Sequence, residues 1–136
     1  MLTNEAAALS TEPDGMFVSF ASLKTGKAAF ERGEDSLEVV GTPDLVIEVV
    51  SPTSRQKDTD ILPRLYHRAG ITGYWLIEPM RRADEVSFDI LKWTPTGYLS
   101  SPTHDGWIDS VVIGKTFRMT RSANSMGESV HRVEFR

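Results

Sequence analysis

The chain has 136 residues, which is enough for one domain with a single hydrophobic core but not for two. Its 40% hydrophobic and 25% charged residues are typical of a soluble globular domain and exclude an intrinsically disordered chain. The absence of cysteine excludes disulfide bonds, cysteine zinc sites and thiol nucleophiles. The net charge of -4 argues against a surface that binds phosphate backbones throughout.

Targeting and membrane-spanning segments are not evident in the sequence. The opening residues MLTNEAAALSTEPDG contain neither a basic region nor a long apolar stretch. No later run approaches the roughly 18 apolar residues that a bilayer-spanning helix needs. We therefore expect one cytoplasmic domain over residues 1–136, with no membrane partner.

The first half of the chain predicts two strands and a hairpin. Residues 16–20 follow the turn sequence Pro-Asp-Gly and predict a strand. Residues 27–30 and 37–40 predict a short hairpin around residues 32–35. Residues 44–51 then predict a central strand that is buried on both faces, because its apolar run shows no alternation.

A helix and a second buried strand follow the central strand. Pro63 is tolerated only in the first helical turn, so we expect the helix to begin near Asp58 to Asp60, with one of these acids as its cap. Gly70 ends the helix, and residues 74–77 predict a second buried strand. Strand, helix and strand in this order predict a right-handed crossover between parallel strands. The apolar residues that recur at helical spacing are Ile61, Leu62, Leu65, Tyr66 and Ala69.

After residue 84 the sequence predicts strands only. Turn sequences rich in Gly, Pro, Asn and Asp separate five apolar segments, and no helical periodicity appears. The fold class is therefore mixed α/β (α+β), with a flanking helix and a β-rich C-terminal half. The predicted strands are residues 86–93, 98–100, 108–113, 116–119 and 130–135.

Glu48 is a carboxylate inside the apolar run of the central strand. Ionised carboxylates almost never occupy such a place unless they are paired, hydrogen-bonded or bound to a metal. Side chains two apart on a strand share a face, so Glu48 points the same way as Asp44, Val46 and Val50. Two interpretations stay open, an oxygen ligand for a divalent metal and a salt-bridged or strand-end carboxylate.

Basic residues are concentrated directly after the central strand. On composition alone, these residues are interpreted as the solvated face of a helix rather than as a binding patch. His67 lies off the apolar stripe and is a weaker candidate for a phosphate site, while Trp75 is expected in the core. The basic residues are Arg55, Lys57, Arg64, His67 and Arg68, with Arg81 and Arg82 after the second strand.

Residues 43–79, PDLVIEVVSPTSRQKDTDILPRLYHRAGITGYWLIEP, closely resemble the core signature of the Uma-two family of putative restriction endonucleases, a branch of the PD-(D/E)XK nuclease superfamily. Residues 11–20, TEPDGMFVSF, resemble the preceding strand of that family with its own Pro-Asp. The resemblance implies a restriction-endonuclease-like mixed sheet flanked by helices. It also implies DNA as the substrate and two carboxylates on adjacent antiparallel strands that bind Mg²⁺ or Mn²⁺, while a lysine orients or activates the attacking water.

Geometry favours Asp14 over Asp44 as the partner of Glu48. If the first strand pairs antiparallel with the central strand, its start lies beside the end of the central strand. Asp14 then meets Glu48, whereas Asp44 lies toward the opposite end. The alternative for Asp14 is a plain turn residue, which is a common use of Pro-Asp-Gly.

The sequence departs from the family pattern at the lysine and at the N-terminus. The superfamily lysine usually stands two residues after the glutamate, where this chain has Val50, and the position used by many family members is Leu62 here. Lys57 is the best replacement, and Arg64 is a weaker one because a guanidinium is a poor proton acceptor. Only about a dozen residues precede the first Pro-Asp, where the family normally has a helix and a strand, so the N-terminal helix is missing here, which implies a shortened member, a fragment, or a sheet completed by a partner such as a second copy in a homodimer.

Three hypotheses follow. The first is a Mg²⁺-dependent (or Mn²⁺-dependent) DNA endonuclease with Asp14 and Glu48 as metal ligands and Lys57 near the attacking water. The second is a catalytically degenerate member of the same fold that acts as a DNA-binding or protein-interaction module. The third is a small β-rich interaction domain in which Glu48 forms an ion pair with Arg55 or Arg64.

Overall fold

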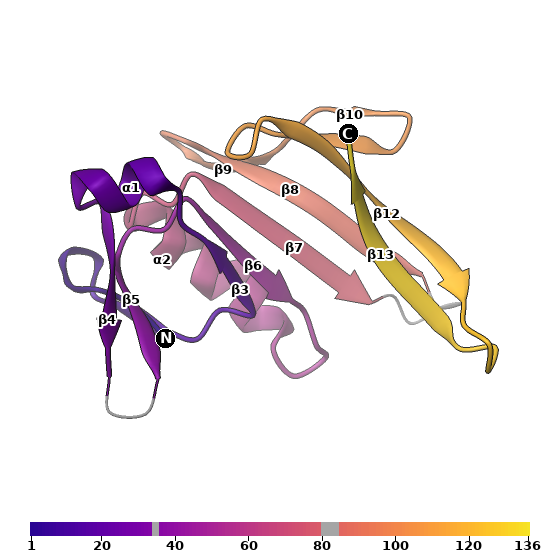
Figure 1. The fold of residues 1–136 in the computed structure, drawn as a ribbon, viewed down its shortest axis with the longest axis horizontal. Coiled ribbons are helices and arrows are strands. Elements are labelled where there is room, and N and C mark those ends of the chain that lie inside the picture. The colour runs from indigo at the N-terminus through magenta and orange to yellow at the C-terminus, as the bar shows by residue number, and fades with distance from the viewer. Residues whose placement is uncertain (34–35, 80–84) are drawn as a thin grey trace.

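The computed structural model describes residues 1–33, 36–79 and 85–136, which form three β-sheets and associated helices (Figure 1). The predicted turn residues Glu34 and Asp35 and the basic residues Arg81 and Arg82 lie outside the described residues. The architecture is mixed α/β, with a mixed central sheet, a flanking helix and a β-rich C-terminal half. It confirms the predicted fold class.

The central sheet has the strand order β3-β6-β7-β8-β9. Its middle strands, β6 (Leu45–Val49) and β7 (Gly73–Pro79), are parallel, as the strand-helix-strand order predicts. The other three strands pair antiparallel with their neighbours; they are β3 (Gly15–Phe17), β8 (Val86–Thr94) and β9 (Gly97–Ser100).

The helix between β6 and β7 begins earlier than predicted. Its backbone is already helical at residue 55, runs through a π-helical segment at Lys57–Ile61, and continues as α2 (Leu62–Arg68). The acids at the predicted start are not caps, because the hydroxyl of Ser51 accepts a hydrogen bond from the Ser54 amide at 3.1 Å and so supplies the cap.

The π-helical segment changes which helical residues are buried. A π turn holds one more residue than an α turn, so it shifts the phase of the preceding residues relative to α2. Ile61 is 48% exposed, contrary to the prediction, whereas Leu62 and Tyr66 are buried as predicted. Leu65 and Ala69 pack partly buried against the same core.

The helix ends at the predicted glycine. Gly70 adopts a φ of 74° and donates a hydrogen bond to the His67 carbonyl, and the Ile71 amide bonds to the Tyr66 carbonyl. This pair of bonds is a Schellman motif, in which a glycine takes the left-handed conformation at no steric cost.

A second sheet, of order β2-β1-β5-β4, is built from strands that precede β6 in the chain. The predicted hairpin is confirmed as β4 (Ala28–Arg32) and β5 (Leu37–Gly41). Two short strands that were not predicted, β1 (Leu2–Asn4) and β2 (Leu9–Thr11), flank a 3-10 turn at Glu5–Ala7.

The predicted strand at residues 16–20 is wrong at its end, because β3 stops at Phe17 and a short helix, α1 (Phe20–Thr25), follows. The hydroxyl of Ser19 caps this helix by accepting a hydrogen bond from the Ser22 amide.

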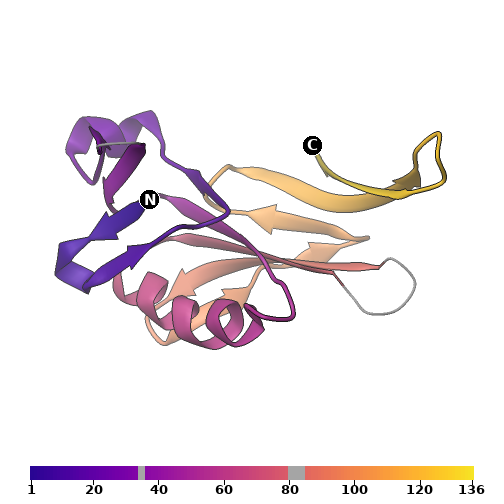
Figure 2. The same cartoon turned by 90° about the horizontal axis from the view of Figure 1, so that it is seen from below.

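The third sheet, of order β10-β11-β12-β13, lies on the face of the central sheet opposite α2 (Figure 2). Its long hairpin confirms the last two predicted strands, but the predicted strand over residues 108–113 stops at Ser110. A turn replaces its end, with the Gly114 amide bonded to the Ser110 carbonyl at 2.8 Å. The strands are β10 (Thr103–His104), β11 (Trp107–Ser110), β12 (Lys115–Ala123) and β13 (Ser129–Phe135).

Two hydrophobic cores lie on the two faces of the central sheet. One contains Tyr66 and Val46 under α2, and the other contains Leu45 and the predicted core residue Trp75 under the third sheet. Because side chains alternate along β6, Glu48 shares the α2 face with Val46. Within the described residues, no helix has both the length and the apolar character needed to cross a membrane.

Candidate active site

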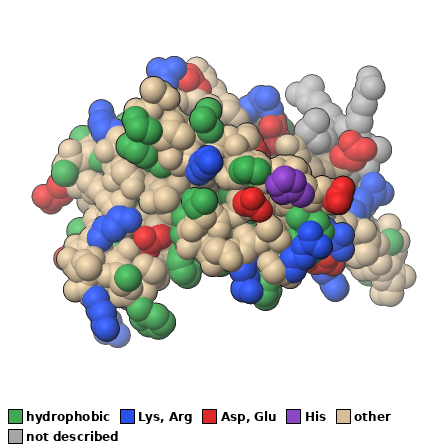
Figure 3. Space-filling view, turned by 90° about the horizontal axis from the view of Figure 1, so that it is seen from above, with side chains coloured by type: hydrophobic (Ala, Val, Ile, Leu, Met, Phe, Trp, Pro, Cys, Tyr) green, Lys and Arg blue, Asp and Glu red, His purple; other side chains and the backbone are tan. Residues whose placement is uncertain are grey.

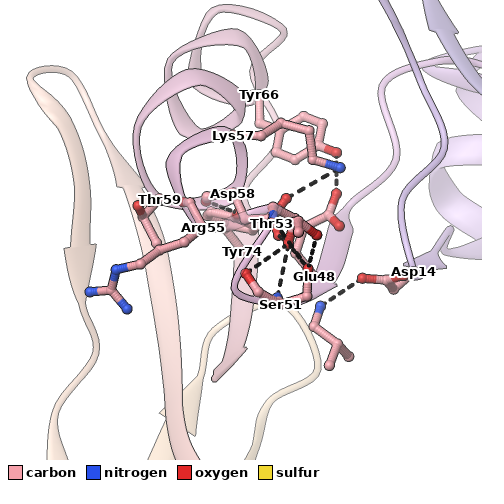
Figure 4. A network of polar contacts seen from close by, with 12 residues as sticks. Asp14, Glu48, Ser51, Thr53, Arg55, Lys57, Asp58, Thr59, Tyr66 and Tyr74 are labelled. Carbon is pink, nitrogen blue, oxygen red and sulfur yellow. Dashed lines mark hydrogen bonds and ion pairs between the residues drawn. The ribbon is translucent and has the colours of Figure 1, made fainter. Parts of the chain in front are cut away.

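The first feature of the site is the register of β3 on β6. Gly15 pairs with Ile47 in an antiparallel ladder, so the next residue back, Asp14, lies beside Glu48. The Asp14 carboxylate also accepts a hydrogen bond from the Val49 amide at 2.7 Å, which fixes it at the end of β6 (Figure 4). The antiparallel pairing predicted from the sequence is therefore present, and it brings these two carboxylates together.

Glu48 is buried against α2, with a relative exposure of 2%. Its Oε1 accepts a hydrogen bond from the Tyr66 hydroxyl at 2.6 Å. The guanidinium groups that could have paired with it are engaged elsewhere, since Arg55 pairs with Glu78 and Arg64 pairs with Asp60. Within the part of the chain that the structure describes, no cation forms an ion pair with Glu48.

The environment of Glu48 favours its protonated form. The pKa of the Glu48 carboxyl is raised from 4.5 to about 7, mainly by burial, although the hydrogen bond from Tyr66 opposes the rise. The negative charges of Asp58 and Asp14, and a hydrogen bond with the Asp14 carboxyl, also contribute to this rise. A carboxyl with a pKa this high lacks a compensating positive charge.

Two buried tyrosines support the site. Burial raises the pKa values of Tyr66 and Tyr74, so both hydroxyls stay protonated and act as donors. The Tyr74 hydroxyl donates to the Asp58 carbonyl at 2.5 Å, and the two rings pack edge to face at 5.5 Å. The hydroxyl of Tyr66 therefore holds Glu48 in place, and the hydroxyl of Tyr74 holds the π-helical segment.

Asp58 belongs to the site although the sequence analysis assigned it only a possible capping role. Its side chain is 1% exposed, and its Oδ2 accepts a hydrogen bond from the Ser54 hydroxyl at 2.5 Å. Its Oδ1 has no hydrogen-bond donor among the described residues. The signal that could have revealed its burial is its spacing, since Asp58 precedes Leu62 and Tyr66 by four and eight residues.

Among the described basic residues that follow the central strand, Lys57 lies nearest to these acids. Its ammonium nitrogen lies 3.4 Å from Oδ1 of Asp58, and about half of the side chain is exposed. Figure 4 shows the Lys57 side chain extending along the helix toward the part of the site occupied by the Glu48 carboxylate and the Tyr66 hydroxyl.

The other basic residues of this group that the structure describes make contacts of their own. Their contacts are Arg55 with Glu78, Arg64 with Asp60 at 2.7 Å, Arg68 with the Ala7 carbonyl at 2.6 Å, and His67 with the Thr94 carbonyl at 2.6 Å and with the Trp93 ring. On the face seen in Figure 3, basic and acidic side chains are interspersed. Such contacts are typical of a solvated helix face, the interpretation that composition favours.

Asp44 lies at the opposite end of β6 and is held by neighbouring residues. Burial alone would raise its pKa, but hydrogen bonds from the Ser19 amide, the Ser22 and Ser19 hydroxyls and the Lys27 ammonium outweigh this effect and lower the pKa. Lys27 lies 3.2 Å from the carboxylate. Asp44 thus anchors the start of α1.

The two positions where the family pattern would place a lysine are core positions. Val50 and Leu62 are each 4% exposed. A lysine at either position would need a buried partner, whereas Lys57 reaches the acids from the half-exposed side of the helix. Among the described residues, the ammonium that faces Asp58 belongs to Lys57.

The donor set suits a hard divalent cation. Within the described residues, no group of three or more Asp, Glu, His or Cys side chains is arranged to hold a metal. Two carboxylates with water and substrate oxygens are nonetheless the usual ligands of Mg²⁺. When ionised, Asp14, Glu48 and Asp58 carry three negative charges against the one positive charge of Lys57, an imbalance that a divalent cation would neutralise.

Comparison with known proteins gives one family. A sequence model of the Uma2 family, described as "Putative restriction endonuclease", matches residues 5–105. The match contains Asp14, Glu48, Lys57 and Asp58, and it stops before β11. No curated protein matches the chain.

Proposed function

The chain belongs to the Uma2 family of putative restriction endonucleases, and on that basis we propose that it is a metal-dependent endonuclease that hydrolyses DNA phosphodiester bonds. One observation carries the proposal, the antiparallel register that sets Asp14 beside a buried Glu48 whose charge is uncompensated. Such a pair of carboxylates is destabilising by itself and becomes favourable when a cation lies between them.

Asp14 and Glu48 are the proposed ligands of Mg²⁺ or Mn²⁺. The Val49 amide orients Asp14, and the Tyr66 hydroxyl orients Glu48, so the cation would replace the proton that the two carboxyls share in their mutual hydrogen bond. A bound cation supplies charge stabilisation at the phosphate and lowers the pKa of a coordinated water.

Lys57 is the proposed residue near the attacking water. Its ammonium donates hydrogen bonds and offsets the charge that builds on the phosphate during hydrolysis. Arg64 is a weaker alternative, because it is 79% exposed and paired with Asp60. About half of the Lys57 side chain is exposed, so its ammonium lies at the surface of the protein next to the buried acids.

A cleavage assay tests the proposal. Plasmid DNA and a single-stranded RNA of equal length are incubated with the wild type in Mg²⁺, Mn²⁺ or EDTA, and with Glu48→Gln, Asp14→Asn and the surface control Asp60→Asn. We expect metal-dependent cleavage of DNA by the wild type and by Asp60→Asn, and a loss of about 10² or more in the other two variants. Equal cleavage by Glu48→Gln and the wild type would reject the proposed site.

The alternative is a catalytically degenerate module of the same fold. The observation that favours it is the replacement of the family's lysine positions by the buried residues Val50 and Leu62. DNA binding by the wild type without cleavage in either metal would support this alternative over the endonuclease.

A further inference from the structure

Asp58 is a buried carboxylate to which the proposed hydrolysis gives no role. It lies inside the π-helical segment Lys57–Ile61, and its side chain is 1% exposed. Asp60, two residues further along, is half-exposed and pairs with Arg64 on the surface. The two acids therefore differ in environment although they share a helix.

The polar contacts of Asp58 leave one oxygen without a hydrogen-bond donor. The Ser54 hydroxyl satisfies Oδ2, and the Tyr74 hydroxyl is bonded to the Asp58 carbonyl rather than to its carboxylate. Oδ1 has no donor within hydrogen-bonding geometry, and the Lys57 ammonium is the cation that faces it, at 3.4 Å. A buried carboxylate in this position requires a nearby positive charge.

The same contact restricts Lys57. A lysine side chain has four rotatable carbon bonds, and a half-exposed lysine without a partner would populate many rotamers. The charge of Asp58 is also felt at Glu48, where it contributes to the raised pKa. Figure 4 shows that the ammonium that faces Asp58 extends toward the Glu48 carboxylate and the Tyr66 hydroxyl.

The π-helical segment explains how consecutive residues serve one site. Single-turn π segments occur often at functional sites, because the extra residue redirects the neighbouring side chains. Here the segment buries Asp58 beside Ser54 while Lys57 stays half-exposed and still reaches the Asp58 carboxylate.

We infer that Asp58 is a positioning residue that holds the Lys57 ammonium at the Glu48 site. The inference rests on the proposed function, because that function places Lys57 near the attacking water. The contact between Asp58 and Lys57 can nevertheless be tested without any catalysis. The contact joins a buried carboxylate and a flexible ammonium on adjacent residues.

NMR of the metal-free protein with ¹⁵N-labelled lysine tests the contact directly. The mobility of the Lys57 ammonium is compared with that of Lys24, an exposed lysine on α1. We expect Lys57 to be clearly more restricted in the wild type and in Asp60→Asn, and to become as mobile as Lys24 in Asp58→Asn. A Lys57 that is already as mobile as Lys24 in the wild type overturns the inference, even if Asp58→Asn does not fold.

Cleavage kinetics test the consequence for catalysis. In saturating Mn²⁺, Asp58→Asn should lower kcat by about 10- to 100-fold with little change in the KM for DNA, because misplacing a catalytic group has effects of this size. In a Lys57→Ala background, Asp58→Asn should cause no further loss, since the two residues act as one unit. A further loss of the same size as in the wild-type background would give Asp58 a role that is independent of Lys57. If the wild type does not cleave DNA, the proposed function fails, while the NMR comparison still decides the role of Asp58.

Discussion

At the scale of single residues, the protonation of Glu48 links the stability of the metal-free protein to pH. Its pKa is raised from 4.5 to about 7, mainly by burial, so the folded state binds this proton more tightly than the unfolded state. The resulting stabilisation is fully present below pH 4.5 and is lost as the pH rises through 7. The shift corresponds to about 3 kcal/mol.

Glu48→Gln should therefore stabilise the metal-free protein at pH 8 by roughly 1 to 3 kcal/mol, and should have little effect at pH 4. Glutamine is uncharged at every pH and keeps an oxygen that can accept the hydrogen bond from Tyr66. Urea unfolding in EDTA at the two pH values measures the difference. A variant that is less stable than the wild type at pH 8 would mean that a positive charge compensates Glu48.

Tyr66→Phe should raise the pKa of Glu48 above its present value of about 7, because the lost hydroxyl stabilises the ionised form. NMR titration of the Glu48 carboxyl in the metal-free protein measures the shift. Tyr98→Phe is the matched control, since its hydroxyl donates to the Ile71 carbonyl at 2.6 Å and not to Glu48. Equal pKa values in both variants would show that Tyr66 does not tune Glu48.

The residues of the site differ in how far the sequence reveals them. Glu48 is visible as a charge in an apolar strand, and antiparallel pairing then selects Asp14 over Asp44. Asp58 is less visible, because only its spacing of four and eight residues from Leu62 and Tyr66 indicates its burial, and the sequence does not show the π-helical segment that sets the phase of the helix. The contact between Asp58 and Lys57 appears only when that phase is known.

At the scale of elements, the π-helical segment determines which side of the helix meets the sheet. Leu62 is 4% exposed and Ile61 is 48% exposed, although an unbroken α-helical stripe would bury both. The segment therefore separates two neighbouring apolar residues that the sequence pattern treats alike.

Leu62→Ala should lower the free energy of unfolding by about 2 to 5 kcal/mol, as buried large-to-small changes do. Ile61→Ala should change it by no more than about 1 kcal/mol, because half of that side chain already meets solvent. Denaturant unfolding of the two variants gives the comparison. Equal losses would show that the helix is a regular α-helix that buries both residues.

Long elements with strong patterns are predictable here, and short ones are not. The parallel pair β6 and β7 and the hairpin of β4 and β5 follow from apolar runs and turn residues. The strands β1 and β2 have three residues each, too few to show a period. The helix α1 begins at a serine cap inside a segment whose Met-Phe-Val-Ser-Phe sequence also suits a strand.

At the scale of the whole molecule, two cores share one sheet. The core under α2 contains the site, while the core under the third sheet is built from Trp75 and residues such as Phe117, whose rings lie 4.7 Å apart. The family match ends at residue 105, so Phe117 lies outside it although it packs on the central sheet. We expect residues beyond the family match to be needed for the stability of the site-bearing sheet.

Phe117→Ala should therefore destabilise the protein by about 3 to 5 kcal/mol, the usual effect of truncating a buried phenylalanine. Phe135→Ala, at a position that is 64% exposed on the neighbouring strand, is the matched control and should have a much smaller effect. Thermal or urea unfolding distinguishes the two. A small effect at Phe117 would mean that the third sheet contributes little to the stability of the central one.

The shared cation of Asp14 and Glu48 is tested most directly by titrating Mn²⁺ into the protein at pH 8 and measuring the bound metal by electron paramagnetic resonance. Wild type, Asp14→Asn, Glu48→Gln and Asp44→Asn are compared after each is shown to be folded. The wild type and Asp44→Asn should bind one Mn²⁺ with similar affinity, and the other two variants should bind it at least about tenfold more weakly. Undiminished binding in both Asp14→Asn and Glu48→Gln, or no binding in the wild type, would contradict the account.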